Sequence, residues 1–210
     1  MDRPQHMLVL GATGKTGREI VQQALKKNNV VTAYVRNPSK ITVSNKNLQI
    51  IQGDLHDSEK LTQALQGQDA VISALGPKKL TDTFMTPTTK VIIEAMKRAH
   101  VKRFIMLSSF AVHPDFKVPL PMKLIWPLMK STFEDKKVAE NLLRKTDLAW
   151  TIVYATRLTN GAHSTNYHVT QTLPKWILTA SISRANVADF LIRCVTDTTM
   201  IHKMPIILEK

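Results

Sequence analysis

Three of the seven glycines in the chain fall within residues 11–17, which read Gly-Ala-Thr-Gly-Lys-Thr-Gly. An apolar run, His6–Leu10, comes directly before them, and a segment with helical apolar spacing comes directly after. In such a strand–turn–helix, the first glycine allows the tight turn, the second lets a pyrophosphate approach the backbone, and the third lets the helix pack closely. The N–H groups that open the helix then bind phosphate. The spacing predicts a dinucleotide-binding turn, and the competing interpretation is a structural glycine-rich turn without a ligand.

Gly14-Lys15-Thr16 also matches the end of a P-loop. A P-loop needs another glycine five residues before Gly14, where this chain has Val9. A nucleotide triphosphatase is therefore disfavoured. Lys15 is expected beside the cofactor phosphates or in solvent.

Basic residues after the second strand-like run indicate which dinucleotide is bound. An acidic residue at this place favours NAD, whereas a nearby arginine accommodates the 2′-phosphate of NADP. Arg36 and Lys40 follow Val30–Val35, and no acidic residue lies between Glu19 and Asp54. Because arginine can hold a phosphate through two hydrogen bonds, the sequence predicts NADP(H) over NAD(H). The alternative is that Arg36 and Lys40 are ordinary solvated charges.

Two later turns should contact the same ligand. Asp54 follows the third strand-like run and can accept from an adenine amino group while Leu55 covers the ring, unless Asp54 caps the next helix instead. Gly76 and the basic pair Lys78 and Lys79 follow the fourth run. Because strand ends line the ligand crevice of open α/β sheets, these residues are expected near the pyrophosphate or the nicotinamide ribose.

The elements that position these turns alternate along the chain. Strand-like runs are expected at His6–Leu10, Val30–Val35, Leu48–Ile51, Asp69–Leu75, Arg103–Leu107, Trp150–Tyr154 and Pro205–Leu208. Helical apolar spacing is found at Gly14–Lys27, Ser58–Leu65, Thr88–Ala99, Phe133–Lys145 and Ala185–Thr196. Alternation of this kind predicts an α/β fold: a Rossmann-like, doubly wound parallel sheet with helices on both faces. One domain is expected over residues 1–210.

Composition restricts the partners. Lys and Arg number 29 against 16 Asp and Glu, a formal charge of +13, which suits a polyanionic ligand. The basic residues are spread along the chain without a recognisable nucleic-acid module, so no specific nucleic-acid partner is expected.

The only cysteine, Cys194, excludes an internal disulfide, and the scattered histidines predict no metal site. No apolar run at the N-terminus is long enough for a signal segment or a membrane span, and a cytoplasmic location is expected.

The segment 113–129 holds four of the ten prolines, with apolar residues such as Phe116 and Trp126 between them. Proline at that density breaks regular structure. The segment is interpreted as a flap packed on the core, and a substrate lid or an oligomer contact is the alternative. The protein is expected to be a monomer or a weak homodimer.

Several motifs together carry a family likeness. The chain resembles the atypical short-chain dehydrogenase/reductases of the NmrA-like NAD(P)H-binding group, and within it the flavin reductase (biliverdin IXβ reductase) type. The supporting segments are Gly11–Gly17, Val35-Arg36, Gly53-Asp54, Gly67–Ile72, Val101–Ser109 and Ser183–Arg193. The resemblance implies a Rossmann-like sheet, bound NADP and hydride transfer to a flat conjugated acceptor.

Two positions of this likeness bear on the chemistry. Ser109, at the end of the fifth strand-like run, matches a serine that faces the acceptor in flavin reductases; the alternative is a polar strand end without a task. Arg157 stands where that family has a histidine. This departure disfavours biliverdin-like substrates, and Arg157 could instead hold an anionic acceptor such as a flavin phosphate.

The Tyr-x-x-x-Lys pair of ordinary short-chain dehydrogenases is missing. Its phenol protonates a carbonyl oxygen, but none of the three tyrosines here has a lysine four residues later. The helix that would host the pair reads Phe133-Glu134-Asp135-Lys136-Lys137, and if Phe133 occupies the place of the tyrosine, the proton donor is absent. Alcohol–ketone interconversion is therefore disfavoured, as is a nucleotide-sugar epimerase. Flavins and quinones need less help, because their reduced anions are delocalised and can take protons from water.

The sequence thus favours an NADPH-dependent oxidoreductase acting on a flavin or quinone, and the alternative is an NADP(H)-binding redox sensor that regulates a partner without turnover. Ser109 and Arg157 are the candidate catalytic residues. The candidate cofactor-binding residues are Gly11, Thr13, Gly14, Lys15, Thr16, Gly17, Arg36, Lys40, Asp54, Leu55, Leu75, Gly76, Ser108, Ala155 and Thr156.

Overall fold

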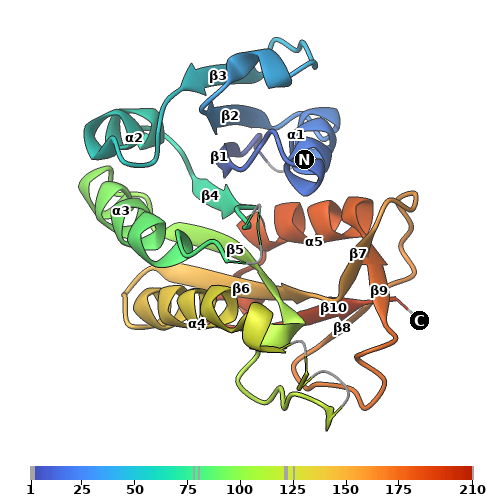
Figure 1. The fold of residues 1–210 in the computed structure, drawn as a ribbon. Helices are drawn as coiled ribbons and strands as arrows, with labels where there is room; N and C mark the ends of the chain where they lie inside the picture. Colours follow the sequence, from blue (N-terminus) through green and yellow to red (C-terminus); the bar gives the residue numbers. More distant parts are fainter. Residues whose placement is uncertain (1–2, 78, 80, 121–122, 125, 210) are drawn as a thin grey trace.

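An eight-stranded sheet runs through the molecule with helices on both faces (Figure 1). The computed structural model describes residues 3–77, 79, 81–120, 123–124 and 126–209. The strands of this sheet are β1 (His6–Leu10), β2 (Val30–Val35), β3 (Leu48–Gln52), β4 (Ala70–Ser73), β5 (Arg103–Ser109), β6 (Ala149–Ala155), β8 (His168–Thr170) and β10 (Ile206–Leu208). The helices are α1 (Lys15–Lys26), α2 (Ser58–Leu65), α3 (Met85–Arg98), α4 (Lys130–Arg144) and α5 (Arg184–Thr196).

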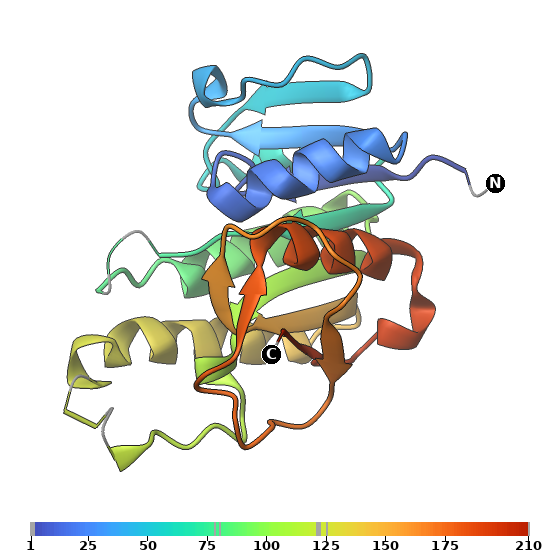
Figure 2. The same cartoon turned by 90° about the vertical axis from the view of Figure 1, so that its right-hand side faces the viewer.

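The strand order is β3-β2-β1-β4-β5-β6-β10-β8. All neighbours pair in parallel except β10 and β8, which are antiparallel. The order reverses between β1 and β4, which is the switch point where open α/β sheets bind ligands. In Figure 2 the strands β2 and β3 point toward the edge at which the loop after β4 and the segment 113–129 also lie. The predicted doubly wound α/β fold is confirmed, with β8 as an antiparallel exception.

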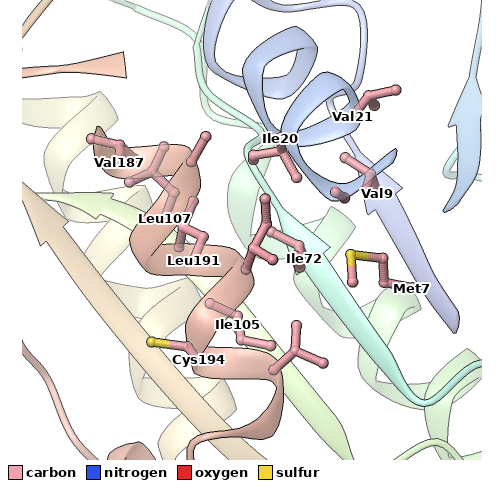
Figure 3. Close-up of a cluster of buried hydrophobic side chains, with 14 of the residues drawn as sticks. Met7, Val9, Ile20, Val21, Ile72, Ile105, Leu107, Val187, Leu191 and Cys194 are labelled. Atoms are coloured by element: carbon pink, nitrogen blue, oxygen red, sulfur yellow. The ribbon is translucent and has the colours of Figure 1, made fainter. Parts of the chain in front are cut away.

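The sheet buries a separate apolar core on each face because side chains alternate along its strands. Met7 and Val9 of β1 pack under α1 and α5, whereas Leu8 and Leu10 belong to the core on the side of α2, α3 and α4. Figure 3 shows the first of these cores, with Ile20 of α1 close to the centre. Residues Met7 to Leu10 of β1 are all buried, on both faces of the sheet, which explains why these four residues are all apolar.

Two helices begin three residues earlier than predicted. The predicted starts were Thr88 and Phe133, whereas α3 begins at Met85 and α4 at Lys130. No side chain near the start of α3 caps it. Instead, the carboxylate of Asp135 on α4 accepts from the N–H groups of Met85 and Thr86 at 2.7 and 3.0 Å. This capping residue lies 50 residues away from Met85 in the sequence, so no local sequence motif predicts it.

Three short strands were not predicted. They are β7 (Arg157–Thr159) and β9 (Ser181–Ser183), which form a parallel two-stranded sheet, and β8. Each has three residues, too few for a period to be recognised.

As predicted, the proline-rich segment lacks regular elements in its described part, apart from short 3₁₀ turns such as Trp126–Leu128. Among the described residues, no helix combines the length and the apolar character needed to cross a membrane.

Candidate functional site

The glycine turn after β1 is tightly enclosed by backbone. Gly11 has a φ of +79°, and a Cβ there would lie 2.7 Å from the carbonyl oxygen of Ala74. A Cβ on Gly17 would overlap the carbonyl oxygen of Gly11. These two glycines are therefore required by the turn itself: Gly11 for its left-handed backbone and Gly17 for the approach of α1 to the turn.

Gly14 differs from the other two glycines because its surroundings are open. Its backbone is extended at φ −74°, and the contact that a Cβ would make is with the Gly11 oxygen at 3.2 Å. Gly14 is the N-cap of α1, no side chain caps this helix, and its first turn has no acidic residue. The first-turn N–H groups are thus left for an anion, as phosphate binding requires. Around them, Thr13 is half-buried, Lys15 is exposed and Thr16 is buried.

A cavity of about 470 Å³ lies next to the switch point. It brings together five of the predicted cofactor-binding residues, which come from three separate turns: Arg36, Asp54, Leu55, Leu75 and Gly76. Sequence reasoning missed the other side of this cavity, which is lined by His56, Asp82, Thr83, Phe84 and Thr88. His56 directly follows Leu55 in the turn before α2, whereas the other four residues precede or belong to the first turn of α3, which begins earlier than predicted.

The turn that carries Asp54 is fixed by Tyr34 of β2. The Tyr34 hydroxyl donates to the Asp54 carbonyl oxygen at 2.9 Å, and a Cβ on Gly53 would overlap the Tyr34 ring. Burial, followed by the nearby carboxylates of Asp57 and Asp54, raises the pKa of Tyr34 to about 12. The phenol therefore stays protonated and keeps donating.

The Asp54 side chain does not cap α2. Its carboxylate accepts from the His56 N–H at 2.9 Å, while Asp57 caps the helix by accepting from the Lys60 N–H at 3.0 Å. The alternative role weighed for Asp54 thus belongs to Asp57. The Asp54 side chain is 52% exposed and lines the cavity, where it can accept from a ligand.

Lys40 lies outside the main cavity, in a separate shallow hollow that it lines together with Arg18 of α1. Arg18 donates to the Lys40 carbonyl oxygen at 3.4 Å. The sequence analysis did not single out Arg18, because an arginine on a helix usually looks like a solvated charge. Arg36, exposed after β2, lines the main cavity instead, so the structure places Arg36 and Lys40 in two different hollows. Lys78, expected near the same ligand, lies outside the described residues.

The ends of β5 and β6 form the other half of the site. Ser109 pairs with Ala155 in the sheet register, and Thr156 and Arg157 follow directly. Ser109 is half-buried, and its Oγ accepts from the Ala111 N–H at 3.4 Å. Arg157 is exposed. The register therefore places both candidate catalytic residues at one edge of the sheet.

Thr156 is 4% exposed, and its Oγ1 finds no hydrogen-bond partner among the described residues. An unpaired buried hydroxyl costs about 1–3 kcal/mol, so a ligand that bonds to it would be stabilising. The uncapped helix start, the open surroundings of Gly14 and this hydroxyl all fit a dinucleotide lying across the switch point.

Ser108 points to the opposite face from Ser109, as alternate residues of a strand do. Its Oγ donates to Glu140 Oε1 of α4 at 2.5 Å, and the Tyr154 hydroxyl donates to Glu140 Oε2 at 2.6 Å. The ring of His113 meets the ring of Tyr154 edge-on at 4.9 Å. Burial raises the pKa of Glu140 and lowers that of His113. Sequence analysis missed this buried network, and it placed Ser108 at the cofactor instead.

The orientation of α4 changes which residues correspond to the Tyr-x-x-x-Lys pair. Its buried lysine is Lys136, whose pKa is lowered by burial, while Lys137 is exposed. The residue four positions before Lys136 is Thr132, which is buried on the same face of the helix. Phe133 instead stacks on Trp126 at 4.9 Å. Thr132, rather than Phe133, therefore occupies the position of the tyrosine relative to the inward lysine.

Comparisons with known proteins agree with this geometry. The profile of a family described as NAD(P)H-binding matches residues 11–198. An uncharacterised chloroplast protein of Arabidopsis thaliana is 30% identical over 207 residues, covering 92% of this chain and 72% of its own length. Oxidoreductase stcQ of Emericella nidulans is 30% identical over 159 residues, covering 65% of this chain and 58% of its own.

Among solved structures, a short-chain dehydrogenase/reductase of Veillonella parvula in complex with NADP superposes with a TM-score of 0.78. The superposition covers 99% of this chain and 95% of that one, at 23% identity. The fold is thus shared with a protein that binds NADP. On the profile match and the glycine turn together, the chain belongs to the NAD(P)H-binding family.

Proposed function

We propose that this protein is an NADPH-dependent reductase that passes a hydride to a flat conjugated acceptor of the flavin or quinone type. The observation that carries the proposal is the pairing of Ser109 with Ala155, which gathers two hydroxyls and an arginine at the carboxyl edge of the sheet. The membership in the NAD(P)H-binding family and the oxidoreductase relative support the reaction class.

The cofactor, when bound, supplies the hydride. The start of α1 around Gly14 would hold its phosphates, and the Thr156 hydroxyl would bond to its nicotinamide end. Arg36 would pair with a 2′-phosphate, because a guanidinium matches phosphate oxygens in two hydrogen bonds. Arg18, brought near by the fold, adds charge at the same end.

Ser109 would orient the acceptor, because a hydroxyl can donate to a carbonyl or a ring nitrogen. A serine hydroxyl is too weak an acid to act as a strong proton donor, so protons would come from water. Arg157, exposed two residues beyond Ala155, would hold an anionic group of the acceptor such as a flavin phosphate.

The test is steady-state NADPH oxidation with FMN, riboflavin and a soluble quinone. Ser109→Ala should lower turnover about 10- to 100-fold with every acceptor. Arg157→Ala should raise KM for FMN and leave riboflavin largely unchanged, which would identify a binding role. Arg98→Ala, an exposed charge in the last turn of α3, is the matched control and should change neither.

Turnover with none of the acceptors, together with tight NADPH binding, would reject the reductase. That outcome would favour the alternative function, an NADP(H)-binding redox sensor. The sensor needs the glycine turn and Arg36 but no role for Ser109 or Arg157.

A further inference from the structure

The three most exposed large apolar side chains of the described residues lie in one short segment. Leu120, Leu124 and Leu128 are 80%, 89% and 66% exposed, whereas the next, Val138, is 48% exposed. Single exposed leucines are ordinary, but three so strongly exposed within nine residues of one segment are unusual and call for a partner.

The aromatic residues of the same segment face the protein. Trp126 stacks on Phe133 of α4 at 4.9 Å, and Phe116 lies 6.2 Å from Trp126 and 5.4 Å from Phe110, which follows β5. These contacts pack Phe116 and Trp126 against the body of the protein, whereas Leu120, Leu124 and Leu128 are exposed to solvent. In Figure 2 the described residues of this segment lie below α4, at the carboxyl edge of the sheet.

The charged residues of the segment 116–130 are all lysines. Lys117, Lys123 and Lys130 are exposed, and no acidic residue occurs between Asp115 and Glu134. Lys130 Nζ lies 3.7 Å from Glu134, so that charge is partly neutralised, and Lys117 and Lys123 are the stronger candidates for an external anion. The whole chain carries +13, which adds a long-range attraction to anionic surfaces.

Leucines interleaved with lysines, beside a tryptophan, are typical of segments that lie in the headgroup region of a bilayer. A protein partner would need an apolar groove rimmed by acidic groups, whereas an anionic lipid surface offers both features everywhere. Each lysine near such a surface contributes about 1 kcal/mol, and each buried methylene of a leucine adds to it.

We propose that the segment 116–130 docks the protein on an anionic lipid surface, with Leu120, Leu124 and Leu128 inserted and Lys117 and Lys123 on the headgroups. Docking would turn the carboxyl edge of the sheet toward the bilayer. The proposal does not depend on the reductase function, because vesicle binding is measured without cofactor or acceptor.

The first experiment is co-sedimentation with phosphatidylcholine vesicles containing about one third phosphatidylglycerol, and with phosphatidylcholine alone. The wild type should bind the anionic vesicles much more tightly than the neutral ones. Leu124→Glu should weaken this binding more than tenfold. Ile50→Glu, on the exposed edge strand β3 at the opposite end of the sheet, is the matched control and should bind as the wild type does. Circular dichroism and thermal melting verify that each variant is folded.

A second pair of variants tests the charge. Lys117→Gln combined with Lys123→Gln should weaken binding roughly 25-fold at low salt, which corresponds to about 1 kcal/mol for each lysine. Lys26→Gln combined with Lys60→Gln removes the same charge from α1 and α2 and should have a much smaller effect.

Three outcomes would overturn the proposal. The wild type could fail to bind anionic vesicles, or the leucine and lysine variants could bind as tightly as their controls. In the third, size-exclusion chromatography would show a dimer that Leu124→Glu dissociates, without vesicle binding, and the patch would then be an interface between two copies of this chain.

Discussion

Ser108 and Glu140 form a short buried hydrogen bond, 2.5 Å from Oγ to Oε1, that ties the end of β5 to the middle of α4. The second carboxylate oxygen of Glu140 accepts from Tyr154 of β6 at 2.6 Å. One glutamate therefore joins two adjacent strands to the helix that covers them. Since Ser109 follows Ser108 directly, this bridge also fixes the strand end that carries the proposed acceptor site.

Glu140→Gln should reveal the raised pKa of this carboxyl group through stability. Burial raises its pKa above the ordinary 4.5, so the folded state binds the proton more tightly than the unfolded state does. The contribution of Glu140 to stability is then largest at low pH and falls as pH rises from about 4.5 through the raised pKa. Glutamine does not titrate, so the stability of the wild type relative to Glu140→Gln should decrease over that range.

Urea denaturation of both proteins at a series of pH values measures this difference. Glu134→Gln, on the exposed side of the same helix, is the control for removing one carboxylate charge from α4. A pH-independent difference for Glu140→Gln would contradict the assignment.

Gly14→Val should abolish NADPH binding and leave the fold intact. The backbone at Gly14 is extended, and a Cβ there meets only the Gly11 oxygen at 3.2 Å within the described surroundings, so the new side chain would occupy space needed by phosphate. Gly17→Ala should instead destabilise the protein by about 1–3 kcal/mol, because its Cβ would overlap backbone. Cofactor titration and thermal melting separate the two effects. Normal NADPH binding by folded Gly14→Val would mean that the turn has been misassigned.

Arg36→Ala should remove the preference for NADPH. Losing a charge-assisted phosphate contact costs about 1.5–3 kcal/mol, so NADPH affinity should fall roughly 10- to 150-fold while NADH affinity changes little. Lys60→Ala, an exposed charge on α2 outside the cavity, is the control. The measurement is fluorescence titration with both cofactors. Equal affinity of the wild type for the two would refute the choice of NADP(H).

Asp135→Ala should lower the free energy of unfolding by about 1–2 kcal/mol, because the first two N–H groups of α3 lose their acceptor and the helix dipole its counter-charge. Its neighbour Glu134 is 61% exposed, and Glu134→Ala should cost much less. Thermal and urea denaturation compare the two variants. Equal effects would show that the cap contributes nothing beyond an ordinary surface carboxylate.

The sequence alone determined the alternation of strands and helices and the glycine turn, because both are local. A buried strand must be continuously apolar and a helix must repeat its apolar residues with its turn, while Gly11 is required by its own φ of +79° and Gly17 by the nearby carbonyl oxygen of Gly11. The turns at Arg36, Asp54 and Gly76, which line one cavity, could be predicted for the same reason: each follows a recognisable strand.

The tertiary structure decided the contacts between residues that are far apart in the chain. The cap of α3 comes from Asp135, the direction of Ser108 is set by Glu140 32 residues away, and Arg18 reaches Lys40 only because α1 packs beside β2. A carboxylate, a hydroxyl or a guanidinium in the sequence looks the same whether it is solvated or buried against a partner. A buried polar group needs a hydrogen-bond partner inside the protein, because burying it unpaired costs free energy. The partner is therefore determined by which groups the fold brings together. The Thr156 hydroxyl, buried directly after β6, has no hydrogen-bond partner among the described residues, and we propose that the cofactor supplies one.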